Sequence, residues 1–255
     1  MAETASDPFD LTGRTALVIG GGGGLGGAIA RGLAARGARV AISGRRQDRL
    51  DAVAAEIGGG AAGFAADVTD IAAIAPLFEA VEAAQGPLDI LVNSQGTTDI
   101  KPAIEFDEAD YDRVVDTNLK SVFFCSTEAG RRMAGRGQGA IVNIASLAAH
   151  YGWANATPYA ISKAGVVALT QSLAAEWGRS GVRVNAISPG FVMTEMNSER
   201  MSDERKAEAR KRAALDRFGE ADEMIGAAVY LASPAAAFVT GAVLRVDGGF
   251  LASGI

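Results

Sequence analysis

The sequence contains few of the residues that build disulfide-bonded or metal-binding proteins. Its 255 residues include one cysteine, Cys125, so no disulfide can form within the chain. They also include one histidine, His150, and the carboxylates are scattered along the sequence. Because a metal site needs several such ligands close together, we expect no bound metal, and we interpret Cys125, which lies in an apolar run, as part of the core.

Excess positive charge and long apolar runs are also lacking. The 24 Lys and Arg are outnumbered by 30 Asp and Glu, which gives a formal net charge of -6 and argues against a nucleic-acid partner. No apolar run approaches the roughly 18 residues that a membrane span needs, and the chain does not open on a basic segment followed by an apolar one. We therefore expect a cytoplasmic protein with neither a membrane nor a nucleic-acid partner.

Glycine, by contrast, is frequent, with 32 residues, and hydrophobic residues make up 49% of the chain. This composition is typical of a globular domain with many close backbone contacts. Apolar, β-rich segments alternate with helical patterns, which predicts an α/β fold with a parallel sheet covered on both faces. The expected strands are 15–20, 39–43, 62–66, 89–93, 140–146, 182–188 and 242–246, and the expected helices are 25–36, 48–57, 71–84, 107–133 and 158–177.

The alternation continues without a break, so we expect a single domain over residues 1–255. A longer insertion, residues 190–219, separates the last two expected strands, and its centre, 200–212, is rich in both charges. Such a stretch is most often the solvated face of a helix. Because the insertion follows a strand whose carboxyl end should face a ligand, the alternative is a substrate lid, which we also expect here.

A glycine-rich segment, Gly20-Gly-Gly-Gly-Gly24-Leu-Gly26, joins the first expected strand to the first expected helix. Glycines permit a tight turn and a close approach of the backbone to a pyrophosphate, while a helix amino terminus offers free N–H groups and partial positive charge. Without that context the segment would be only a flexible turn. In this context it predicts that Gly20, Gly24, Leu25 and Gly26 bind a dinucleotide.

The end of the second expected strand, Ser43-Gly44-Arg45-Arg46, indicates which dinucleotide is bound. A carboxylate at this point would accept hydrogen bonds from the free ribose hydroxyls of NAD and would repel a ribose phosphate. The segment has no carboxylate, and Arg45 beside Gly44 is placed to pair with a phosphate. We therefore expect NADP(H) to be favoured over NAD(H). If both arginines are merely solvated, NAD remains the alternative.

Tyr159 and Lys163 form the most informative pair in the chain. Residues at i and i+4 share a helix face, so the ammonium can lie beside the phenol. An unperturbed tyrosine has a pKa of about 10, and a neighbouring positive charge lowers that pKa toward the range of a usable base. Ser146 ends an apolar, β-rich run, and its hydroxyl can hold a substrate oxygen while the phenol exchanges its proton. Together these residues predict a proton-transfer site at the carboxyl edge of the sheet.

The order and spacing of these motifs resemble the short-chain dehydrogenase/reductase family over almost the whole chain, 11–249. The resemblance rests on the glycine loop, Asn93, Asn118, Ser146, Tyr159 with Lys163, and Pro189-Gly190. It implies a Rossmann-type, doubly wound domain with a seven-stranded parallel sheet. It also implies an NAD(P)-dependent oxidoreductase that interconverts a secondary alcohol and a ketone, and a homotetramer.

The resemblance also implies a role for each matched residue. Tyr159 resembles the catalytic acid/base, Lys163 the residue that lowers its pKa and holds the nicotinamide ribose, and Ser146 the group that binds the substrate oxygen. Asn118 resembles the asparagine that keeps a water in the proton relay. The cofactor contacts that it implies beyond the glycine loop are Asp67, Val68, Asn93, Gly96, Tyr159, Lys163, Pro189, Gly190, Val192 and Thr194.

Two positions depart from the family's pattern. Ile19 stands where the family usually has threonine, and Ser94-Gln95 stands where it usually has Asn-Ala. In the family, that threonine hydroxyl commonly bonds to the asparagine motif, and Ile19 cannot make this bond. We expect Ser94 or Gln95 to offer replacement polar groups, and the alternative for Gln95 is contact with substrate.

The residues expected near the substrate are mixed in character: Gln95, His150, Trp153 and Asn155. His150 is either a loop side chain bonded to backbone or a ligand for a sugar hydroxyl, and Trp153 is either packing or a stacking platform. Overall the chain is most similar to sugar-acid and polyol dehydrogenases of the family, such as the gluconate 5-dehydrogenase group, which implies a sugar, sugar acid or polyol substrate. A 3-oxoacyl-thioester reductase and a simple ketone reductase are alternatives. A nucleotide-sensing regulator without turnover is the alternative of another class.

Overall fold

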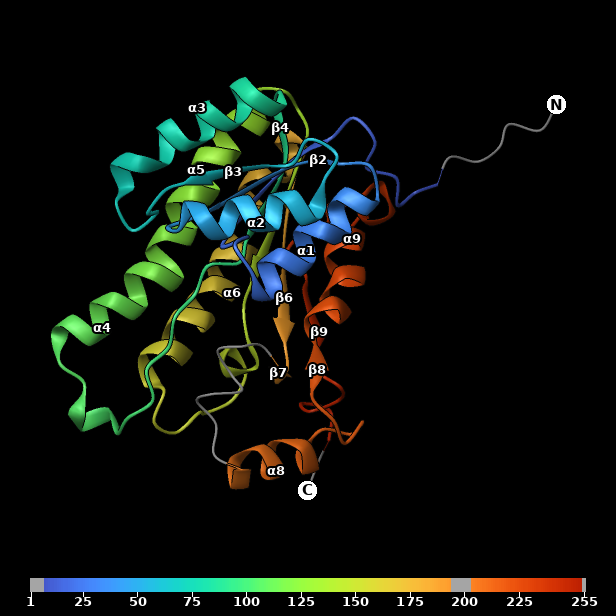
Figure 1. Ribbon diagram of the computed structural model, residues 1–255. Helices are drawn as coiled ribbons and strands as arrows, with labels where there is room; N and C mark the ends of the chain where they lie inside the picture. The colour runs from blue at the N-terminus through green and yellow to red at the C-terminus, as the bar shows by residue number, and fades with distance from the viewer. Residues whose placement is uncertain (1–6, 194–202, 254–255) are drawn as a thin grey trace.

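A seven-stranded sheet forms the centre of the protein in the computed structural model, which describes residues 7–193 and 203–253 (Figure 1). Every neighbouring pair of strands is parallel. Across the sheet the strands are β3 (Ala62–Ala65), β2 (Arg39–Gly44), β1 (Thr15–Ile19), β4 (Leu88–Asn93), β5 (Gly139–Ile144), β6 (Val182–Pro189) and β9 (Val243–Val246). The direction of winding reverses between β1 and β4, as in a doubly wound sheet, and this confirms the predicted fold.

Helices cover both faces of the sheet, and this explains why the strands are almost continuously apolar. In β1, Ala16 and Val18 pack into the core on one face, whereas Leu17 and Ile19 pack into the core on the other. The first face is covered by α1 (Gly24–Ala35), α2 (Gln47–Ile57) and α9 (Ile225–Ala232), and the second by α3 (Ile74–Gln85), α5 (Ser121–Ala134) and α6 (Thr157–Trp177) (Figure 1).

The long helix expected over 107–133 is divided. α4 (Glu108–Val115) is followed by a π-helical turn, Asp116–Lys120, before α5 begins. Asp107 caps α4 by accepting a hydrogen bond from the backbone N–H of Asp110. The remaining short helices, all 3₁₀, are Ile71–Ala73, Ala103–Glu105, Leu147–Ala149, Gly178–Ser180, Ala221–Met224 and Pro234–Ala236.

The insertion expected over 190–219 lies beyond the carboxyl end of the sheet (Figure 1). The strands and helix described within it are β7 (Val192–Met193), α8 (Asp203–Arg212) and the start of β8 (Gly219–Glu220), and β7 pairs with β8 in a small second sheet. The expected cofactor residue Thr194 lies outside the described residues. Among the helices described, none has the length and apolar character needed to cross a membrane.

Candidate active site

The glycine loop forms a cradle that side chains would block. Gly20 has φ 77°, and a Cβ there would lie 2.8 Å from the backbone nitrogen of Gln95. A Cβ on Gly26 would lie 2.2 Å from the carbonyl oxygen of Gly20. Helix α1 starts at Gly24, and within the described chain no side chain caps this end. The loop therefore presents a bare backbone and a helix amino terminus, which fits the pyrophosphate of a dinucleotide.

The end of β2 lies against this cradle. The carbonyl oxygen of Ser43 accepts hydrogen bonds from the backbone N–H groups of Gly20 (2.8 Å) and Gly21 (3.1 Å). Arg45 follows as an exposed residue near Asp67. The pKa of Asp67 is lowered chiefly by the hydrogen bond from the Thr69 hydroxyl, with a smaller contribution from the charge of Arg45. Val68 is buried beside them.

The two departures from the family pattern meet through the backbone. Ile19 packs its side chain into the core, and its carbonyl oxygen accepts a hydrogen bond from the N–H of Ser94 at 2.9 Å. Gln95 is buried, and its Nε2 donates to the hydroxyl of Ser121 at 3.0 Å. The Gln95 amide nitrogen is therefore directed at α5, whereas its Oε1 is buried without a hydrogen-bond partner among the described residues. Contact of Gln95 with substrate stays a prediction.

Asn93, expected to contact the cofactor, also directs its side chain at α5. Its Nδ2 donates to the hydroxyl of Ser126 (3.0 Å) and to Oδ1 of Asn143 (2.9 Å). Asn93 is 1% exposed, so its amide lies within the core beneath the cradle. Any contact of Asn93 with a cofactor would therefore be made by its backbone.

Asn118 lies in the π-helical turn, and its side chain forms hydrogen bonds with the segment that follows β4. Its Oδ1 accepts from the N–H of Thr97 (2.8 Å), and its Nδ2 donates to the carbonyl oxygen of Thr97 (2.8 Å) and to the hydroxyl of Ser162 (3.1 Å). A Cβ on Gly96 would lie 3.5 Å from Oδ1 of Asn118 and 3.7 Å from Nζ of Lys163. Because both amide hydrogens of Asn118 are used, a relay water at this side chain could only donate to Oδ1.

Lys163 is buried at the carboxyl end of β5. Its Nζ donates to the carbonyl oxygen of Ile144 at 2.8 Å and lies 5.9 Å from the centre of the Tyr159 ring. Burial lowers the pKa of Lys163 to about 8, because removal from water disfavours the charged ammonium. The lysine can therefore exchange a proton near neutral pH.

Tyr159 and Ser146 meet next to this lysine. Burial raises the pKa of Tyr159, and the hydrogen bond with Ser146 opposes this rise. The direction differs from the lowering expected from sequence, since the lysine donates its hydrogen bond to Ile144 and desolvation dominates at the phenol. The hydroxyl of Ser146 accepts a hydrogen bond from the N–H of Ala148 at 3.2 Å, which fixes its orientation.

Four aromatic residues, Tyr151, Trp153, Phe191 and Phe250, form what we call the aromatic wall. The Trp153 ring meets the Tyr159 ring edge to face, with ring centres 5.8 Å apart, and meets Phe191 at 5.6 Å. Tyr151 stacks on Trp153 at 6.5 Å, and Phe250 lies 5.6 Å from Tyr151 and 5.4 Å from Phe191. Trp153 therefore contacts both Tyr159 and Phe191, which follows β6.

The contacts of His150 and Asn155, also expected near the substrate, are with Ser188 and with the backbone of Lys101. Nε2 of His150 lies 2.9 Å from the hydroxyl of Ser188 on β6. The pKa of His150 is lowered by burial and by Arg245, against an opposing effect of Asp247. Asn155 is exposed with φ 64°, and its carbonyl oxygen accepts from the N–H of Lys101 at 2.9 Å. Of the four expected residues, only Trp153 makes a described contact with the Tyr159 ring.

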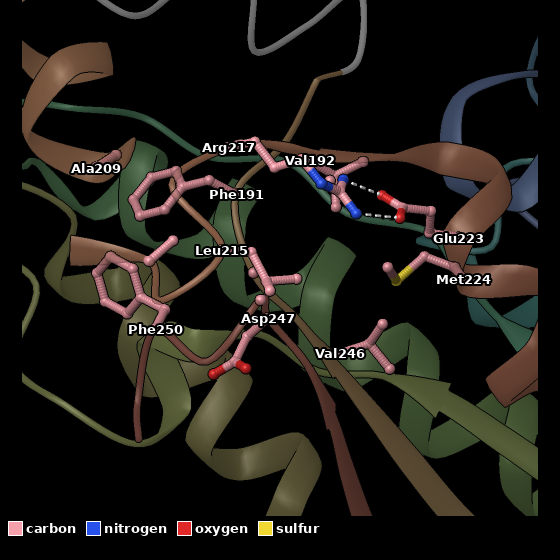
Figure 2. A pocket seen from close by; sticks show the side chains of 14 residues that line it. Phe191, Val192, Ala209, Leu215, Arg217, Glu223, Met224, Val246, Asp247 and Phe250 are labelled. Atoms are coloured by element: carbon pink, nitrogen blue, oxygen red, sulfur yellow. Dashed lines mark hydrogen bonds and ion pairs between the residues drawn. The ribbon is translucent and has the colours of Figure 1, made fainter. Parts of the chain in front are cut away.

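A pocket of about 120 Å³, partly open to solvent, is lined by residues 190–192 (Figure 2). The rings of Phe191 and Phe250 line one side of it. At another side the Arg217 guanidinium pairs with both carboxylate oxygens of Glu223, at 2.7 and 2.6 Å. Neither Ser146 nor Tyr159 lines this pocket, but Phe191, which does, contacts the Trp153 ring beside Tyr159.

Sequence reasoning missed Ser162, which binds both Asn118 and the backbone of Tyr159. Its position three residues after Tyr159, on the same helix face, was a usable signal. The pairing of Asn143 with Thr170 on α6 was also missed. No local pattern indicates it, since the two residues are brought together by the packing of α6 on the sheet.

A parallel sheet with a glycine cradle at its switch point and a serine, tyrosine and lysine at the carboxyl edge defines a nicotinamide-dependent oxidoreductase acting on CH–OH groups. Residues 20–251 match a family model described as enoyl-(acyl carrier protein) reductase. The chain belongs to the short-chain dehydrogenase/reductase family.

Similar proteins cover nearly the full length of the chain. Gluconate 5-dehydrogenase of Gluconobacter oxydans is 40% identical over 253 residues, which are 97% of this chain and 98% of that protein. D-threitol dehydrogenase of Mycolicibacterium smegmatis is 43% identical, covering 95% and 94% of the two chains. A solved structure from Beutenbergia cavernae, described as a putative NAD(P)-dependent gluconate 5-dehydrogenase with NADP bound at low occupancy, has a TM-score of 0.92 at 43% identity and covers 97% and 100% of the two chains.

Proposed function

We propose that Ser146, Tyr159 and Lys163 form the site at which this enzyme interconverts a secondary alcohol and a ketone. The observation that carries the proposal is the state of Lys163. Its ammonium is buried beside the Tyr159 ring, and its pKa is lowered to about 8. Lysines with a strongly lowered pKa are typical of proton-transfer sites, because a lysine exposed to solvent keeps its ordinary pKa.

Each residue has a defined part in the proposed reaction. Ser146 binds the substrate oxygen, and Tyr159 donates a proton to that oxygen during reduction or accepts one during oxidation. Lys163 then exchanges its own proton with the phenol near neutral pH. Asn118 keeps the Gly96–Thr97 segment beside the Lys163 ammonium through its bonds to Thr97. When bound, the nicotinamide cofactor supplies or accepts the hydride.

The cofactor that we propose is NADP(H). Arg45 lies near Asp67 at the end of β2, where a ribose phosphate would need a positive charge. The NADP bound to the Beutenbergia cavernae relative supports the same choice. The residues that we propose to hold the cofactor are Gly20, Gly24, Leu25, Gly26, Gly44, Arg45, Asp67, Val68, Asn93, Gly96, Tyr159, Lys163, Pro189, Gly190, Val192 and Thr194.

We propose a sugar, sugar acid or polyol as the substrate. The relatives named for gluconate and threitol support this class. The Trp153 ring beside Tyr159 supports it too, since an aromatic face packs well against the C–H groups of a sugar. The test is a panel of sugar acids, polyols, 3-oxoacyl thioesters and simple ketones, followed by nicotinamide absorbance. A kcat/KM highest for a thioester would transfer the proposal to acyl reduction, which the matched family description favours.

Replacing Tyr159 with Phe tests the proposed chemistry. The variant lacks the proton donor, so turnover is expected to fall by at least about a hundredfold. Binding of NADPH, measured by the change in its fluorescence, is expected to stay nearly unchanged. Retained turnover would remove Tyr159 from the mechanism. Loss of NADPH binding as well would show that the replacement disturbs the fold.

We further propose that the insertion acts as a lid, and that the enzyme is a cytoplasmic homotetramer. The Arg212 guanidinium at the end of α8 lies over the rings of Tyr151 and Phe250, with 5.4 and 4.9 Å to the ring centres. These contacts attach the insertion to the aromatic wall. Exposed aromatic side chains on α4 and α5, Tyr111, Phe123 and Phe124, support self-association.

A further inference from the structure

Helix α6 carries Tyr159 and Lys163, whereas Ser146 follows β5, so the site depends on how these two elements are held together. The helix packs mainly over β6, the next strand of the sheet. It reaches β5 through two hydrogen bonds from side chains. One is from Nζ of Lys163 to the carbonyl oxygen of Ile144 (2.8 Å). The other is from Nδ2 of Asn143 to the hydroxyl of Thr170 (3.0 Å), about two helical turns further along α6.

The second bond belongs to a chain of buried hydrogen bonds in which each side chain donates to the next residue along the chain. Nδ2 of Asn93 donates to Oδ1 of Asn143 (2.9 Å), Nδ2 of Asn143 donates to Thr170, and the Thr170 hydroxyl donates to the carbonyl oxygen of Val166 (2.8 Å). Asn93 is 1% exposed, and Asn143 and Thr170 are 0% exposed. Because Thr170 gives its only hydrogen to Val166, it can serve Asn143 only as an acceptor, and this fixes the orientation of each side chain.

We propose that Asn143 and Thr170 are positioning residues, which set the register of α6 against β5 and so place Tyr159 beside Ser146. This inference rests on the proposed function of the Ser146, Tyr159 and Lys163 site. The packing of α6 on β6 and on the Leu147–Ala149 turn holds the helix in place, and two hydrogen bonds to β5 about two turns apart add a restraint on both its shift and its rotation. Burial in a region away from water makes an unpaired amide costly, so the Asn143–Thr170 bond favours one register.

Thr170→Val tests the proposal, because valine has nearly the shape of threonine and lacks the acceptor. We expect kcat to fall between about tenfold and about a hundredfold, as for a small misplacement of reacting groups. The KM for NADP should change less than kcat, because the glycine cradle lies on β1 and α1 and not on α6. The apparent pKa in the pH profile of kcat should also shift, since Lys163 sits at the other attachment point.

Two controls separate positioning from stability. Thr170→Ser keeps the hydroxyl and loses the methyl group, so it should restore the kcat and pH profile of the wild type. Thr127→Val on α5 removes a hydroxyl that donates only to its own helix, at the carbonyl oxygen of Phe124 (3.0 Å), so it should change neither. If Thr170→Val does not fold, Thr170→Cys, whose sulfur is a weak acceptor, takes its place with the same expected loss.

Turnover and pH profile unchanged in a folded Thr170→Val or Thr170→Cys variant would overturn the proposal. A Thr170→Ser variant with a kcat as low as that of Thr170→Val would also overturn it, because the loss would then come from the missing methyl group and not from the missing hydrogen bond. These outcomes differ from failure of the proposed function itself, which would appear as turnover retained in Tyr159→Phe.

Discussion

At the scale of the residue, burial controls the chemistry of the Tyr159 and Lys163 pair. Both groups are removed from water, which raises the pKa of the phenol and lowers that of the ammonium, so each favours its neutral form. The ordinary values, about 10 and 10.4, therefore move apart. The lysine becomes the group that can release a proton at physiological pH, and the hydrogen bond from Ser146 partly offsets the burial of the tyrosine.

The lowered pKa of Lys163 predicts a dependence of stability on pH. Between pH 8 and about 10.4 the unfolded chain keeps a proton on this lysine that the folded protein has lost, so the free energy of unfolding rises with pH. The slope is on the order of 1 kcal/mol per pH unit. Urea unfolding at pH 7.5 and 9.5 should show this rise in the wild type and a smaller one in Lys163→Met. Equal changes in the two proteins would contradict the lowered pKa.

Arg45 carries a prediction about cofactor choice. Arg45→Asp places a carboxylate where a ribose phosphate is proposed to bind, so kcat/KM should fall for NADP and hold or rise for NAD. The ratio of kcat/KM for NADP to kcat/KM for NAD is expected to change by more than about tenfold, because one charge-assisted hydrogen bond to the phosphate is lost. Arg46→Asp, with the same change of charge at the next exposed residue, is the matched control. An equal effect of both replacements would point to a general charge effect.

At the scale of the element, the turn between β1 and α1 shows why particular positions of the glycine run must be glycine. Gly20 needs a positive φ, and Gly26 needs to lack a side chain because the carbonyl of Gly20 lies above it. The π-helical turn is a second element with special local geometry, and from it the Asn118 side chain donates hydrogen bonds to Thr97 and Ser162. Such turns inside helices are frequent at functional sites.

Gly26→Ala is predicted to weaken cofactor binding. Its Cβ would lie 2.2 Å from a backbone oxygen, and since that oxygen cannot swing aside, the loop must shift. A cost of about 1–3 kcal/mol corresponds to a roughly five- to 150-fold increase in the Kd for NADPH. Gly22→Ala in the same loop is the matched control, since the nearest atom to its Cβ is a side-chain carbon of Leu50 at 3.5 Å. Fluorescence titration measures both, and an unchanged Kd for Gly26→Ala would refute the steric argument.

At the scale of the whole molecule, the sheet collects residues from distant parts of the chain at one edge. The cradle follows β1, the Asn118 contacts follow β4, Ser146 follows β5, and the loop of Gly190 and Val192 follows β6. Parallel strands all end at the same edge, and this brings the four segments together. The aromatic wall then connects that edge to the insertion and to the carboxyl-terminal turn.

Self-association is the prediction at this scale. Light scattering of the purified protein should give the mass of a tetramer. Phe124→Glu places a charge on the exposed face of α5 and should shift the protein to smaller species, because burial of an unpaired charge is unfavourable. Ala55→Glu, exposed on α2 across the sheet, is the control and should leave the mass unchanged. A monomer in the wild type would exclude the proposed tetramer.

The sequence by itself determined the order of strands and helices, because strands buried on both faces are continuous apolar runs. It also indicated the glycine cradle and the Tyr159–Lys163 pair, since both depend on residues close together in the chain. It did not indicate the break in the helix expected over 107–133, because a π-helical turn is stabilised by what Asn118 contacts across the fold.

Only the tertiary structure decided where the polar side chains of the site are directed. Nε2 of Gln95 donates to the hydroxyl of Ser121 on α5, and Nε2 of His150 lies beside the hydroxyl of Ser188 on β6. The direction of the Tyr159 pKa shift also reversed the expectation, because desolvation depends on everything packed around the phenol and not on the lysine alone. Local spacing determines which groups lie on one helix face, whereas burial and the partners from other strands determine what those groups can do.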